Sequence, residues 1–216
     1  MENLNKLFDE ITQELTSEGQ LFEVREYINK KGFKSKEYAS FPDSLKGYFD
    51  FGALHGEKDF LVYESERFTF KETITKAAQF ANALISNGIK KGDRVAAYVP
   101  NKIESIISFL ACAKNGIIWS SCSPDFGTQG VVDRFKQIEP SILITCDYYF
   151  YNGKKINILE KIEDILKQIP SIKKTLVFAY KKKEEIDLQN YINFEQVLEK
   201  EKMDETFERF EFNHPI

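Results

Sequence analysis

The stretch that decides the fold begins with FTFKETITKAAQFANALISNG at residues 68–88 and continues, after a short polar turn, with RVAAYVP at residues 94–100. In the first part, Thr69 followed by Glu72 is typical of a capped helix start, and Asn87-Gly88 is typical of a helix end. The apolar side chains between these signals share one helical face: Ile74, Ala77, Ala78, Ala81, Leu84 and Ile85. The second part is a short apolar run ended by proline, which predicts a buried strand.

The same alternation of helix and strand continues along the chain. Asn101 is expected to cap a second helix, with Glu104 completing a capping box. Further elements are expected as strands at residues 117–120, 141–145 and 175–178, and as helices at residues 131–138 and 158–169. Short strands that are apolar on both faces and separated by helices are what a parallel sheet requires, because each crossover helix covers one face. The sequence therefore predicts an α/β fold, a parallel sheet flanked by helices, over residues 68–180.

Two regions lie outside this predicted core. Residues 1–45 mix charged and aromatic residues around an expected helix from Leu4 to Leu15, and we expect a peripheral arm there. Residues 46–216 are expected to form one partial domain. Its highly charged last part contains one expected helix around Phe194 to Lys200. The apolar Ile216 after Pro215 indicates that a strand is beginning, so we expect the chain to be truncated at this end.

Composition excludes several classes of protein. Of the 216 residues, 42% are hydrophobic and 30% are charged, which excludes a disordered or fibrous chain. The net charge of −4 does not provide the positive field that a nucleic-acid binder uses. No basic and apolar leader and no apolar run near 20 residues is present, so we expect neither targeting nor a membrane partner.

The cysteines predict packing rather than chemistry. Cys112, Cys122 and Cys146 are an odd number without CxxC spacing, and no histidine lies near them. We therefore expect free, buried thiols in a reducing, cytoplasmic compartment and no metal site.

No catalytic group stands out by its pattern. His55 lies in a turn flanked by glycine, and His214 lies two residues from the end, each without an activating partner at suitable spacing. Both are expected to be surface residues. Neither GxxxxGK[ST] nor a GxGxxG motif after a strand is present, so no self-contained nucleotide cradle is predicted.

Four loops remain as candidates. Residues 90–94 are expected to be a structural turn that uses Gly92. Residues 119–128 follow a parallel strand and precede a helix, where open α/β sheets bind ligands, and are either a ligand loop or a plain connection. Residues 151–155 are expected to be a solvated turn, with phosphate contact by its two lysines as the alternative. Residues 181–185 are expected to be a solvated charged loop.

The strings WSSCSPDFG at residues 119–127, DRFKQIEP at residues 133–140 and YNGKK at residues 151–155 carry a family resemblance. The chain resembles the adenylate-forming acyl-CoA ligases, and most narrowly the acetoacetate–CoA ligases among them. The more general string FTFKE…ANAL…GIKKGDRVA occurs across nearly all of these ligases. About two thirds of the chain takes part in the resemblance.

The resemblance implies a two-step reaction. Acetoacetate attacks the α-phosphorus of ATP with Mg²⁺, and the CoA thiol then displaces AMP from the acyl-adenylate. It further implies that Ser123, Pro124 and Asp125 hold CoA, with Lys154 and Lys155 near its nucleotide phosphates. Tyr151 takes the place of an arginine that is common in the family.

The family's ATP-phosphate loop, [ST]-S-G-T-T-G-x-P-K, and its C-terminal catalytic lysine are not within these 216 residues. We therefore expect no catalytic residue here, and an N-terminal portion of the enzyme that is inactive alone. Two alternatives remain. One is part of a short- or medium-chain fatty acyl-CoA ligase, since the first 65 residues of this chain resemble fatty-acid-type CoA ligases more. The other is a noncatalytic CoA-binding module.

Overall fold

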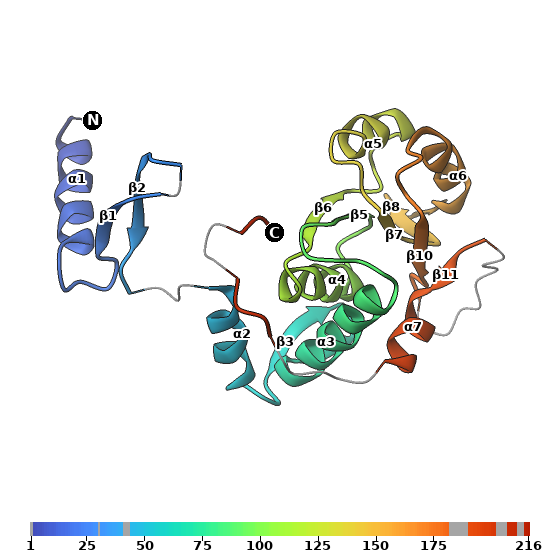
Figure 1. The fold of residues 1–216 in the computed structure, drawn as a ribbon, viewed down its shortest axis with the longest axis horizontal. Helices are drawn as coiled ribbons and strands as arrows, with labels where there is room; N and C mark the ends of the chain where they lie inside the picture. Colours follow the sequence, from blue (N-terminus) through green and yellow to red (C-terminus); the bar gives the residue numbers. More distant parts are fainter. Residues whose placement is uncertain (1, 30, 41–43, 182–189, 202–206, 211–213) are drawn as a thin grey trace. The chain divides into compact units, whose positions relative to one another are not determined.

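The computed structural model describes residues 2–29, 31–40, 44–181, 190–201, 207–210 and 214–216 (Figure 1). The chain forms two compact units, Met1–Asp43 and Ser44–Ile216. The first unit contains helix α1 (Glu2–Thr16) and an antiparallel hairpin of β1 (Val24–Ile28) and β2 (Lys34–Tyr38). The arm expected over residues 1–45 stays a prediction, since its role toward the rest of the protein is not tested. The expected loop at residues 181–185 lies outside the described residues except for Lys181.

The second unit is built on a parallel sheet with the strand order β11-β10-β7-β5-β6. Its strands are β5 (Arg94–Tyr98), β6 (Ile118–Cys122), β7 (Ile142–Cys146), β10 (Lys174–Phe178) and β11 (Ile192–Asn193). Its helices are α2 (Leu45–Ala53), α3 (Phe70–Ser86), α4 (Ile103–Lys114), α5 (Thr128–Phe135), α6 (Leu159–Gln168) and α7 (Phe194–Lys200). Two antiparallel hairpins complete it: β3 (Asp59–Tyr63) with β4 (Glu66–Thr69), and β8 (Tyr148–Tyr151) with β9 (Lys154–Asn157).

The predicted α/β fold with its parallel sheet is confirmed. The chain runs from β5 to β6 on one side and then crosses back over β5 to β7 on the other side. Because crossovers are right-handed, these opposite directions place α4 on one face of the sheet and α5 and α6 on the other (Figure 1). Helix α3 packs beside α4, and the core lies between these layers and the sheet.

The capping box predicted for α3 is present. Thr69 Oγ1 accepts a hydrogen bond from the Glu72 backbone N–H at 3.1 Å, and Glu72 Oε2 accepts one from the Thr69 N–H at 2.9 Å. The expected apolar face is only partly right: Ile85 is 50% exposed, whereas Phe80 and Ala83, which were not expected on it, are buried. Phe80 contacts Phe194 of α7 with ring centroids 4.6 Å apart. Packing against α7 therefore helps to determine which side chains of α3 are buried.

The predicted cap of α4 is wrong. Lys102 occupies the N-cap position, and no side-chain cap hydrogen bond is present. The reason is the proline before it: the Pro100 carbonyl accepts hydrogen bonds from the Lys102 N–H and from Ser105 Oγ, both at 2.8 Å. This turn delays the first helical residue to Ile103, and the expected capping residue Glu104 is itself buried. Helix α5 also begins at Thr128, three residues before the predicted start at Val131.

The described helices include none that is both long enough and apolar enough to cross a bilayer.

Replacing Thr69 with Ala removes the acceptor of the α3 capping box. We expect the free energy of unfolding to fall by about 1 kcal/mol, since that is the usual cost of losing an N-cap side chain. Urea denaturation of the wild type, Thr69→Ala and Thr69→Ser measures this. The serine variant keeps the acceptor and should stay close to the wild type, so an equal loss in both variants would contradict the assignment.

Candidate functional site

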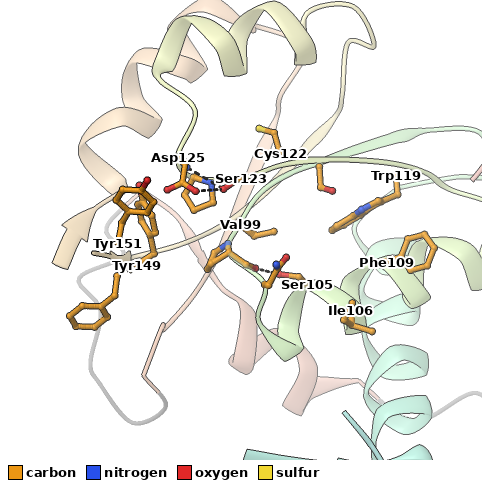
Figure 2. A pocket seen from close by; sticks show the side chains of 15 residues that line it. Val99, Ser105, Ile106, Phe109, Trp119, Cys122, Ser123, Asp125, Tyr149 and Tyr151 are labelled. Atoms are coloured by element: carbon orange, nitrogen blue, oxygen red, sulfur yellow. Dashed lines mark hydrogen bonds between the residues drawn. The ribbon is translucent and has the colours of Figure 1, made fainter. Parts of the chain in front are cut away.

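A pocket of about 440 Å³ lies at the carboxyl edge of the sheet (Figure 2). Three chain segments meet there: the end of β5, the end of β6 with the loop after it, and strand β8, which follows β7. The first turns of α4 close one side. The lining residues are Val99, Pro100, Asn101, Ser105, Ile106, Phe109, Trp119, Ser121, Cys122, Ser123, Pro124, Asp125, Tyr149, Phe150 and Tyr151. The pocket therefore lies where strand order reverses, which is the usual ligand position in open α/β sheets.

Of the candidate loop at residues 119–128, the structure places residues 119–122 in β6, and the turn that follows lines this pocket through Ser123, Pro124 and Asp125. Ser123 Oγ donates to Asp125 Oδ2 at 2.9 Å and accepts from the Asp125 N–H at 3.3 Å. The Phe126 N–H donates to the Ser123 carbonyl at 3.1 Å, which closes a tight turn before α5. Pro124 is buried, whereas Ser123 and Asp125 are exposed. The turn thus presents one hydroxyl and one carboxylate beside the pocket.

Aromatic rings form the two ends of the pocket. Figure 2 shows Tyr149 and Tyr151 beside Asp125 at one end, and Phe109 with Trp119 at the other. Burial raises the pKa of Tyr149, and its hydrogen bond with Asp125 raises it further, so the phenol remains a neutral donor to the carboxylate. Tyr151 is 53% exposed. These rings offer flat apolar surfaces on which a base can stack.

The two lysines named by the resemblance lie on β9, across the hairpin from the pocket wall. Lys154 pairs with Tyr151 and Lys155 pairs with Phe150, and Asn152 and Gly153 form the turn with positive φ values of 48° and 72°. Lys155 Nζ lies 3.6 Å from the centroid of the Tyr148 ring. Neither lysine lines the pocket. Both lysines therefore lie on the β8–β9 hairpin, at the rim of the pocket and not inside it.

Asp125 is the pocket's one carboxylate, and no basic side chain is among the lining residues. The lining also lacks a histidine that could activate one of its serines. The arrangement can stack rings and form hydrogen bonds, but it does not assemble a nucleophile with a base. The expectation of no catalytic residue stays a prediction.

Both histidines lie away from the pocket. His55 is half-buried beside Phe51 and Phe70, with ring centroids 5.2 and 4.8 Å away. His214 Nε2 lies 2.8 Å from the Gly116 carbonyl, at the opposite edge of the sheet. Their expected surface position is therefore only partly right, because each ring packs against the protein.

The Tyr149–Tyr151 wall was missed by the sequence reasoning. The string YYFYNGKK at residues 148–155 contains the signal that could have found it. Asn-Gly after an aromatic run and before Lys-Lys is typical of a two-residue hairpin turn. A hairpin directly after β7 places its first strand at the carboxyl edge of the sheet, beside the loop after β6.

The three cysteines are free and buried. Burial raises the pKa of the Cys122 thiol to about 11 and also raises the pKa values of Cys112 and Cys146. Within the described part of the chain, no group of His, Cys, Asp or Glu side chains could hold a metal ion.

These thiols should react slowly with iodoacetamide at pH 8, because the thiolate is the reactive form and little of it is present. Cys122 should react first, since it is 8% exposed whereas Cys112 and Cys146 are fully buried. Peptide mass spectrometry after timed labelling measures the order. Unfolding the protein in urea should bring all three thiols to similar, faster rates, and preferential native labelling of Cys112 would contradict the packing.

Raised thiol pKa values also predict that stability falls at alkaline pH. The unfolded chain loses these protons above about pH 8.5, whereas the folded chain retains them, so the free energy of unfolding decreases as pH rises toward 11. Thermal melts between pH 8 and 10 measure this. Cys122→Ala should show a shallower decline than the wild type, and an identical decline would exclude the Cys122 thiol as a contributor.

Comparison with known proteins places the fold and the family. A family model described as AMP-binding enzyme matches residues 49–207. Acetoacetyl-CoA synthetase of Xenopus tropicalis is 38% identical over 204 residues, which cover 85% of this chain and 30% of that protein. Acetoacetyl-coenzyme A synthetase of Rhizobium meliloti is 45% identical over 119 residues, which cover 53% of this chain and 18% of that protein.

A solved structure of acetoacetyl-CoA synthetase from Streptomyces lividans superposes with a TM-score of 0.72 at 23% identity. The match covers 99% of this chain and 34% of that chain, and it shows the shared fold. This chain therefore spans only about 30% of the length of the relatives it matches most extensively. Because the family model matches more than half of its residues, the chain belongs to the AMP-binding enzyme family.

Proposed function

We propose that this chain supplies the CoA-binding wall of an acetoacetate–CoA ligase. The whole enzyme would join acetoacetate to ATP, with Mg²⁺, as an acyl-adenylate and release diphosphate. The CoA thiol would then attack the acyl carbon and release AMP. The names of the relatives, acetoacetyl-CoA synthetases of animals and a bacterium, support this choice of substrates.

The observation that carries the proposal is the pocket at the carboxyl edge of the sheet. It sets the exposed groups of Ser123 and Asp125 beside the aromatic rings of Tyr149 and Tyr151, at one end of the cavity. CoA combines an adenine base with a pantetheine arm that carries two amides. The rings can stack the base, while the hydroxyl and carboxylate can accept amide or amino hydrogens. Pro124, the middle residue of the turn, is buried and fixes part of the turn's backbone conformation.

The phosphates of CoA would lie outside the pocket proper, toward the hairpin. Lys154 and Lys155 provide two positive charges there, whereas the Asp125 carboxylate would repel a phosphate placed within the pocket. The ammonium group of Lys155 rests on the Tyr148 ring, so Lys154 is the freer of the two to follow a phosphate. This division assigns the base and pantetheine to the pocket and the phosphates to its rim.

The ATP chemistry would require residues beyond those present here. Neither the phosphate-gripping loop nor the catalytic lysine of the family lies within the 216 residues. We propose a cytoplasmic protein whose partners are its small-molecule substrates, with no nucleic acid or membrane partner. The buried free thiols and the net charge of −4 support this setting.

Lys154→Ala should weaken CoA binding about threefold to fivefold, the effect of roughly 1 kcal/mol expected for one exposed charge contact. Isothermal titration with CoA and with dephospho-CoA measures this. If Lys154 contacts the 3′-phosphate, the substitution should leave dephospho-CoA binding unchanged. Lys173→Ala, which removes a lysine beyond the end of α6, is the matched control. An equal loss of affinity for CoA and dephospho-CoA would show that Lys154 does not contact the 3′-phosphate.

The 216-residue chain should bind CoA without forming the acyl-adenylate. Incubation with acetoacetate, ATP and Mg²⁺ should release no diphosphate above the protein-free blank. A coupled diphosphate assay measures this, with a full-length acetoacetyl-CoA synthetase as the positive control. Turnover by the isolated chain would refute the proposal that the ATP chemistry requires residues beyond these 216.

A further inference from the structure

Tyr98 reaches from the sheet to the underside of the pocket's loop. It is the last residue of β5, and its side chain is fully buried. Its phenolic Oη lies 2.8 Å from the Pro124 carbonyl oxygen and 2.7 Å from the Phe126 carbonyl oxygen. These two carbonyls flank Asp125 in the chain. One side chain therefore contacts the backbone on both sides of the residue that faces the pocket.

The backbone around Tyr98 is itself held on both sides. Thr145 Oγ1 of β7 donates to the Tyr98 carbonyl at 2.9 Å, and the Val99 N–H donates to the Cys122 carbonyl of β6 at 3.2 Å. Tyr98 also pairs in register with Cys122 and Thr145 in the sheet. The phenol thus stands on the central strand of the sheet as a fixed support.

The hydroxyl is the part of Tyr98 that requires explanation. Phenylalanine would fill almost the same buried space, and an unpaired buried hydroxyl would be costly. A phenol has one hydrogen, so it donates to the two carbonyls as a shared hydrogen bond. Burial raises its pKa, so the group stays a neutral donor across the physiological range.

We propose that Tyr98 is a positioning residue that holds the Ser123–Asp125 turn in its pocket-facing conformation without touching the ligand. This inference deepens the proposed function and rests on it for the identity of the ligand, CoA. Without the hydroxyl, the buried Pro124 carbonyl and the part-buried Phe126 carbonyl lose their shared donor, and the turn can reorient so that water replaces it. Asp125 and Ser123 would then no longer face the pocket in a fixed direction.

The test compares Tyr98→Phe with Tyr63→Phe. Tyr63 also forms a phenol hydrogen bond, to Tyr180 Oη at 2.9 Å, but it lies outside the pocket. Trp119 lines the pocket and is the one tryptophan in the sequence, so its fluorescence reports CoA binding directly. Both variants should melt at lower temperature than the wild type.

Tyr98→Phe should weaken CoA binding about tenfold, the equivalent of one net hydrogen bond, whereas Tyr63→Phe should bind CoA within about twofold of the wild type. Tyr98→4-aminophenylalanine, whose amine carries two hydrogens for the two carbonyls, should restore the affinity. A Tyr98→Phe protein that melts lower yet binds CoA as the wild type does would overturn the proposal, and so would equal losses in both phenylalanine variants.

Amide hydrogen exchange separates the failure of this inference from the failure of the proposed function. In the free protein, Tyr98→Phe should speed exchange at residues 123–127 at least tenfold relative to Tyr63→Phe. If the wild type binds no CoA, the proposed function falls, and exchange still decides the role of Tyr98. If Tyr98→Phe does not fold, the wild-type loop decides: exchange as fast as an unstructured peptide would overturn the proposal, and protection would support it.

Discussion

The parallel pairing of β5 with both β6 and β7 is the constraint on which the rest of the structure depends. β5 has Val95, Ala96, Ala97 and Tyr98 buried, and it pairs with a strand on each side. Parallel strands end at the same edge of a sheet, so this pairing brings together the segments after three strands that are far apart in the sequence. Apart from the turns of α4, the walls of the pocket come from those segments and from β6 itself.

Much of this architecture follows from local sequence signals. Thr69 and Glu72 can form a capping box only if a helix starts there, and the four apolar residues of β5 can be buried only between helical layers. The position of the Ser123–Asp125 turn could also be predicted, because a loop between a parallel strand and a helix must lie at the carboxyl edge. These inferences required only the order of elements and the handedness of their connections.

The rest could not be read from local patterns, because it depends on contacts between distant residues. Phe80 rather than Ile85 is buried in α3 because α7, more than 100 residues later, supplies Phe194. The side of the hairpin that faces the pocket is fixed by the pairing of Tyr151 with Lys154. From the sequence, Tyr98 is indistinguishable from the other buried residues of β5. Only the structure shows that its hydroxyl contacts the Pro124 and Phe126 carbonyls. Register and long-range packing, not propensity, set these features.

In the function that we propose, the pocket binds CoA through rings and hydrogen bonds rather than through positive charge. Lys154 and Lys155 lie on the hairpin and not in the pocket lining, so the proposal separates the phosphates of CoA from the Asp125 carboxylate. The most direct measurement of this account is a crystal structure of the 216-residue chain with bound CoA. The account predicts the adenine and pantetheine in this pocket, in contact with the Ser123–Asp125 turn and with the rings of Tyr149 and Tyr151, and the phosphates toward Lys154. CoA bound at any other surface, with this pocket empty, would contradict it.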